Sequence, residues 1–174
     1  MNRDGNEHLR TEAVKRYIIV DPSEKRDLHD LIEVASDVCG TPMALVTLID
    51  ESTQYYKVKK GLEGNSTARE EAFCRYTISQ PDVFIVEDAH LDTRFSSNPS
   101  VTGIPFIRFY AGVPLVTGNG FAIGSLCVID SKPQTLDAVQ ISCLETLGRL
   151  VMHRMELSQS MRAMPGELSE DALV

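Results

Sequence analysis

Apolar residues recur at intervals of three and four along residues 22–39, and this periodicity predicts an amphipathic helix. Asp21 is a suitable N-terminal cap, Pro22 fits the first helical position, and Gly40 suits the C-terminal end. The periodic apolar positions are Leu28, Leu31, Ile32, Ala35 and Val38. We therefore expect one face of this helix to be buried.

Several shorter segments have the pattern of β-strands. Residues 43–50 and 121–130 are almost continuously apolar, as in central strands that are buried on both faces. Further strands are predicted at residues 54–60, 84–87 and 106–116. Short turns separate the first two strands and the last two, so these pairs form hairpins and the sheet must be antiparallel.

The remaining segments complete an α+β domain, with the first and last helices able to pack on one face of the antiparallel sheet. We predict a loop at residues 61–71, a short helix within 72–80, an irregular segment at 88–105 and a long helix from about 136 to 162. The expected organisation is a polar N-terminal arm (1–20), one domain (21–162) and a flexible acidic tail (163–174).

Composition narrows the function. The net charge of −8 disfavours binding to nucleic acid or to anionic membranes, because both need clustered cations. The compact basic run Lys57, Lys59 and Lys60 is interpreted as a solvated strand edge. No apolar run is long enough for a membrane span or a secretory signal, which favours a cytoplasmic protein. The cysteines and histidines lack metal-site spacing, so we expect reduced, packed thiols, no metal and no cofactor.

Three strings resemble the GAF domain family: ALVTLID at 44–50, FCRYTI at 73–78, and IRFYAGVPLVTGNGFAIGSLCVID at 107–130. The resemblance covers about residues 22–155 and is strongest to bacterial GAF modules attached to histidine kinases and diguanylate cyclases. It implies a sheet of five to six strands, with the end helices on one face. It also implies a pocket on the other face, roofed by the middle helix and the irregular segment.

The candidate ligand-binding residues come from the strands and the roof that this layout implies. Such a pocket would be mostly apolar with a few polar groups, which is typical of small-molecule sites. The alternative is a well-packed core without a ligand. The candidates are Tyr56, Phe73, Cys74, Ile78, Phe95, Arg108, Tyr110, Ser125 and Cys127.

Arg108 lies in an apolar strand, where a guanidinium needs a carboxylate or several carbonyls as partners. It could clamp an anionic ligand, or it could fix a loop by pairing with Asp88 or Asp92. We favour the structural role.

Cys74 is the cysteine for which the sequence leaves the most functional roles open. In photoreceptor GAF domains the bilin-attachment cysteine is typically followed by histidine, whereas Arg75 follows here. A redox switch with Cys127 is a second alternative, and a packed thiol is the default. The cysteine spacing does not resemble that of free methionine sulfoxide reductases, and the cyclic-nucleotide signature of other GAF domains is absent. No Ser/His/Asp arrangement stands out, so no catalytic residue is assigned.

The long final helix has an apolar stripe that must be buried. A second copy of the chain could cover part of it as a four-helix bundle, which predicts a homodimer. In related modules such helices lead to a histidine kinase or cyclase output domain, and this chain is either free-standing or a fragment of a longer protein. The leading hypothesis is a sensory module that binds a small molecule. The rivals are a thiol-based redox enzyme or switch and a dimerisation scaffold with a filled pocket.

Overall fold

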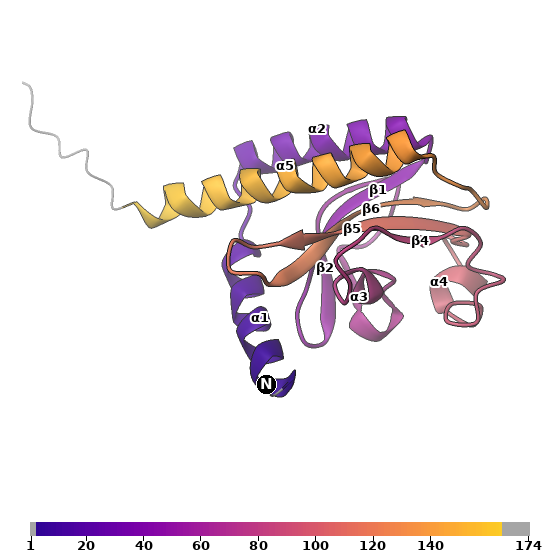
Figure 1. Cartoon of the computed structure of the whole chain (residues 1–174), viewed down its shortest axis with the longest axis horizontal. Helices are drawn as coiled ribbons and strands as arrows, with labels where there is room; N and C mark the ends of the chain where they lie inside the picture. Colours follow the sequence, from indigo (N-terminus) through magenta and orange to yellow (C-terminus); the bar gives the residue numbers. More distant parts are fainter. Residues whose placement is uncertain (1–2, 165–174) are drawn as a thin grey trace, which may run out of the picture.

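The computed structural model describes residues 3–164 and contains a six-stranded antiparallel sheet with helices over both faces (Figure 1). The strand order is β3-β2-β1-β6-β5-β4. The strands are β1 (Met43–Ile49), β2 (Thr53–Lys60), β3 (Ser66–Ala68), β4 (Phe84–Val86), β5 (Phe109–Val116) and β6 (Ala122–Asp130). Every neighbouring pair is antiparallel, so the predicted α+β class and sheet are confirmed. Of the predicted tail, residues 165–174 lie outside the described part.

Helices α2 (Pro22–Cys39) and α5 (Ala138–Ala163) run antiparallel, side by side on one face of the sheet (Figure 1). The Asp21 side chain accepts a hydrogen bond from the Glu24 backbone N–H at 2.8 Å and caps α2, while Asp137 and Gln140 form a capping box on α5. The helices bury their inner faces in one continuous core with the sheet. The predicted pairing of the end helices is confirmed. Among residues 3–164, no helix is long and apolar enough to cross a membrane.

The opposite face of the sheet carries a thinner layer, which we call the roof and define as residues 69–80 and 88–107. It contains the short helices η1 (Arg69–Glu71), α3 (Cys74–Thr77) and α4 (Pro99–Thr102) (Figure 1). A second core, distinct from the one under α2 and α5, fills the space between roof and sheet. The predicted loop at 61–71 also contains β3, which pairs with β2 as the edge of the sheet.

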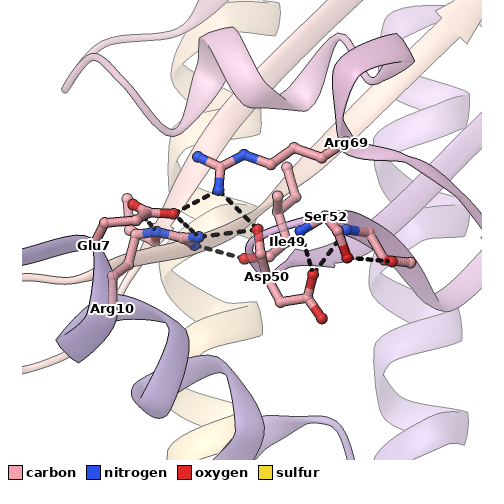
Figure 2. A network of polar contacts seen from close by, with 8 residues as sticks. Glu7, Arg10, Ile49, Asp50, Ser52 and Arg69 are labelled. Atoms are coloured by element: carbon pink, nitrogen blue, oxygen red, sulfur yellow. Dashed lines mark hydrogen bonds and ion pairs between the residues drawn. The ribbon is translucent and has the colours of Figure 1, made fainter. Parts of the chain in front are cut away.

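The predicted polar arm is wrong for most of its length, because Arg3–Tyr17 form a helix, α1, that packs against the sheet. Its sequence has little apolar periodicity. Ala13 and Val14 join the core, and a buried guanidinium adds polar contacts to the sheet. Arg10 donates to the carbonyl oxygens of Ile49 (2.6 Å) and Asp50 (3.2 Å) at the end of β1 (Figure 2). Glu7 binds both Arg10 and Arg69, so one carboxylate joins α1 to the edge of the roof.

Acid titration tests the attachment of α1. Hydrogen bonds from Arg10, opposed by burial and helped by Arg69, lower the pKa of Glu7 from 4.5 to about 2. A carboxylate with a lowered pKa stabilises the fold above its unfolded pKa, and this contribution disappears as the pH falls toward the folded value. The loss of stability in Glu7→Gln should therefore be full above pH 4.5 and vanish near pH 2.

The size of this effect should be at most about 1 kcal/mol, because solvent screens a carboxylate that is partly exposed. Thermal unfolding of both proteins across this pH range measures it. Glu12→Gln is the matched control, since Glu12 forms an exposed pair with Lys15 on the same helix. Equal acid sensitivity of the native protein and Glu7→Gln would contradict the assignment.

A β-bulge in β2 places one lysine in the core between the sheet and the helices. Tyr56 pairs with Thr47 and Val58 pairs with Val46, so Lys57 is an extra residue without a partner in the ladder. Its ammonium lies 2.9 Å from the carboxylate of Glu24, and both side chains are almost completely buried. The interpretation of Lys57 as a solvated edge is therefore wrong. Lys60 instead meets Glu33 on α2, and Lys59 donates to the Gly64 carbonyl oxygen.

Candidate functional site

A small cavity lies between the sheet and the roof, where the resemblance places a pocket. Its volume is about 50 Å³. Its lining extends from the buried side chains of Tyr110 and Cys127 on the sheet to the exposed Glu71 on the roof. The cavity therefore reaches from the core toward the surface.

Five of the nine candidate residues from the sequence line this cavity: Tyr56, Phe73, Cys74, Tyr110 and Cys127. Strands β2, β5 and β6 supply Tyr56, Tyr110 and Cys127, and the start of α3 supplies the other two. Residues that are far apart in the sequence thus converge on one small space.

The other four candidates lie outside the lining. Phe95 stacks on Phe73, with ring centroids 4.0 Å apart, and both rings belong to the core between the roof and the sheet. Ser125 lies two residues before Cys127 on β6 and so faces the roof as Cys127 does, with its hydroxyl 3.1 Å from that of Thr47. Ile78 ends α3 and lines an open hollow beside α1 instead.

Arg108 is the fourth. It fixes a loop, which is the role favoured from the sequence, but its partners are backbone carbonyls and not the expected Asp88 or Asp92. Its guanidinium donates to the carbonyl oxygens of Val101 and Ile107, both at 3.0 Å. The expected partner Asp92 pairs with Arg94 instead. Arg108 therefore holds the end of α4 through backbone carbonyls and does not line the cavity.

A chain of polar contacts crosses the buried end of the cavity. The Tyr110 hydroxyl lies 2.7 Å from the Thr77 hydroxyl and donates to Cys74 Sγ at 3.2 Å. Cys74 Sγ lies 3.9 Å from Cys127 Sγ. Both thiols are buried, as the default of packed thiols expects, and they are also close enough to leave the alternative of a redox switch open.

The environment makes the two thiols unequal. Burial opposes ionisation of Cys74, but contacts with the Cys127 thiol and with the hydroxyls of Ser125 and Tyr110 outweigh it and lower the pKa of Cys74. Its contact with the Cys74 thiol and its burial raise the pKa of Cys127 well above its usual value. Cys74 is therefore the thiol of this pair that loses its proton first.

The sequence reasoning missed Gln54, which also lines the cavity. Gln54 is buried, and among the described residues its side-chain oxygen has no hydrogen-bond partner. A signal for it was present, because Gln54 and Tyr56 are two positions apart on one strand and thus share a face. An unpartnered buried acceptor is unfavourable, and a small donor in the cavity would satisfy it.

The volume limits what can bind in this conformation. A cavity of about 50 Å³ has room for about one or two water-sized molecules, far below the ~300 Å³ of typical ligand sites. A larger ligand would need the roof to move. The aromatic contacts among Phe73, Phe95 and Tyr110 hold the roof closed over the sheet.

Comparisons with known proteins agree with this architecture. The family model described as GAF domain matches residues 26–155. The chain is 38% identical over 156 residues to a cyclic di-GMP phosphodiesterase from Pseudomonas aeruginosa, covering 89% of this chain and 27% of that protein. The chain thus spans about a quarter of the length of that relative.

Among solved structures, the fold is similar to the GAF domain of a phosphoenolpyruvate-protein phosphotransferase from Coxiella burnetii. The TM-score is 0.68 at 11% identity, covering 94% of this chain and 100% of that one. It is also similar to a free methionine-R-sulfoxide reductase from Neisseria meningitidis, with a TM-score of 0.64 at 15% identity, covering 94% and 95%. At such low identities these likenesses establish the fold alone. With the family match over most of its length, the chain belongs to the GAF domain family.

Proposed function

We propose that this chain is a cytoplasmic sensory module without catalytic activity of its own, which pairs with a second copy through α2 and α5. The observation that carries this proposal is that α5, which continues beyond the sheet (Figure 1), has exposed apolar residues from its middle onward. These exposed apolar residues are Leu150, Leu157 and Met161 in α5 and Met164 directly after its last residue. Their spacings of seven, four and three place them on one side of the helix, as in a coiled-coil seam.

A physical link between the cavity and these helices supports a signalling role. Tyr56 on β2 lines the cavity, and the next residue, Lys57, forms the buried ion pair with Glu24 at the start of α2. The same carboxylate lies 3.3 Å from the guanidinium of Arg162, in the last turn of α5. A shift of β2 would therefore act on the ends of both helices, which is the kind of two-state element that sensors use.

The partners follow from the same reasoning. The chain is similar to about a quarter of a cyclic di-GMP phosphodiesterase. We therefore propose that its partner is an output domain of a kinase, cyclase or phosphodiesterase, which responds to the conformation of this module. The proposed input is a small molecule whose binding would repack the roof. No role with nucleic acid or membrane is proposed, since the net charge is −8.

Light scattering combined with gel filtration tests the pairing. The native chain should elute as a dimer, and Leu157→Glu should elute as a monomer, because the charge would be buried in the paired seam. Leu91→Glu is the matched control, since Leu91 is a roof residue that is 79% exposed, compared with 54% for Leu157. A monomeric native chain, or equal effects of both substitutions, would contradict the proposal.

The size of the cavity favours a second candidate, a dimerisation scaffold with a filled pocket. Native mass spectrometry of the purified chain separates the two functions. A retained small molecule on the dimer supports the sensor, whereas a dimer that never takes up a ligand supports the scaffold.

A further inference from the structure

We propose that Cys74 and Cys127 form a reversible disulfide when hydrogen peroxide, or a hydroperoxide of similar size, enters the cavity. This thiol chemistry goes beyond the proposed function and does not depend on the proposed dimerisation. The bond would fasten α3 of the roof to β6 in the centre of the sheet.

The two sulfurs are already neighbours in the reduced fold. They lie 3.9 Å apart, whereas a disulfide needs about 2.05 Å, so the sulfurs must approach by roughly 2 Å. Cys127 lies on a central strand, while Cys74 begins a four-residue helix, so α3 is the part that can move. The other two cysteines, Cys39 and Cys143, pack in the core on the opposite face of the sheet. Cys74 and Cys127 therefore have only each other as partners within the described residues.

The cavity fits a very small polar oxidant. Both cysteines line it, and its volume of about 50 Å³ admits a molecule of about the size of a water pair. Gln54 supplies a buried oxygen that lacks a donor among the described residues, and hydrogen peroxide brings O–H donors. The Tyr110 hydroxyl, 3.2 Å from Cys74 Sγ, stabilises negative charge on that sulfur.

The chemistry takes two steps. The sulfur of Cys74 attacks one oxygen of the peroxide, so that an S–O bond forms and the O–O bond breaks. The thiol proton goes to the departing hydroxide and gives water, leaving a sulfenic acid on Cys74. Cys127 then attacks the Cys74 sulfur, so that the S–S bond forms, the S–O bond breaks, and the Cys127 proton leaves with the hydroxide as a second water. Two thiols are oxidised by two electrons in total, and one peroxide is reduced to two waters.

Peptide mapping after exposure to hydrogen peroxide tests the proposal. The reduced full chain is treated with the oxidant, its free thiols are blocked with N-ethylmaleimide, and it is digested without reduction. We expect a Cys74–Cys127 cross-link that dithiothreitol reverses, with Cys39 and Cys143 still free to react after unfolding. Absence of that cross-link in the folded chain, or a cross-link that forms only in denaturant, would overturn the proposal.

Three variants sharpen the result. Cys127→Ser should stop at a sulfenic acid on Cys74, which dimedone captures, whereas Cys39→Ser should cross-link like the native chain. Gln54→Leu should slow cross-linking several-fold in the folded chain and leave the thiol reactivity of the unfolded chain unchanged. Equal rates for Gln54→Leu and the native chain would refute oxidant entry through the cavity.

Light scattering on the same samples separates this proposal from the proposed function. A cross-linked monomer refutes only the proposed dimer, and a dimer without the cross-link refutes only the disulfide.

Discussion

Lys57→Met should destabilise the fold by about 3 kcal/mol, because it leaves the Glu24 carboxylate buried without its nearest cation. Arg162 remains 3.3 Å from the other oxygen of that carboxylate, so the loss should lie at the lower end for a broken buried pair. Lys57 also donates to the backbone carbonyls of Tyr17 and Ile19, which join α1 to α2, and these would lose their donor. Urea unfolding at neutral pH measures the change.

A double variant identifies the cause. Lys57→Met combined with Glu24→Met should recover most of the stability, since apolar residues can replace a buried pair at little loss. Lys59→Met is the matched control on the same strand and should change stability by less than about 0.5 kcal/mol. If Lys57→Met and Lys59→Met destabilise equally, the buried pair does not stabilise the contact between β2 and α2.

Gly124→Ala should be equally damaging, and for a different reason. A Cβ at Gly124 would lie 1.8 Å from the backbone oxygen of Thr47 and 2.9 Å from the Cα of Leu48, so β1 and β6 could not stay at their present distance. Backbone cannot yield as a flexible side chain does, so we expect a loss of about 3 kcal/mol or more. The same measurement of urea unfolding applies.

Gly118→Ala is the control for this prediction. Its added Cβ would meet only the Glu156 carboxylate, at 3.8 Å, which is an ordinary contact. We expect a change within about 0.5 kcal/mol. A stable, normally folded Gly124→Ala would show that the two central strands tolerate a wider separation than the structure has.

The fold was largely predictable because its signals are local. The cap at Asp21, the apolar periodicity of residues 22–39 and the hairpin turns each depend on a few neighbouring residues, and the structure confirms them. Helix α1 was not predictable in this way. The buried guanidinium of Arg10 donates to the carbonyl oxygens of Ile49 and Ala122, which are 39 and 112 residues away in the sequence. No local pattern contains those partners.

The site was predictable only in outline. Alternation along the strands indicates which side chains share a face, and together with the layout of the family it places Tyr56, Tyr110 and Cys127 near one another. The distance between Cys74 and Cys127 depends on how closely the roof packs, which no sequence pattern contains. Lys57 was misinterpreted because a bulge changes the alternation by one residue, and a basic run on a strand usually faces water.

The pairing around the bulge in β2 also shows that the β-ladder does not need Lys57. On one side of it Val58 faces the helices opposite Val46, and on the other Tyr56 faces the roof opposite Thr47, so the two faces alternate as in an uninterrupted strand. A chain one residue shorter at this point could form the same ladder in the same register. Lys57 is therefore dispensable as a building unit of the strand, and its place in the chain is explained by the charge it brings to Glu24.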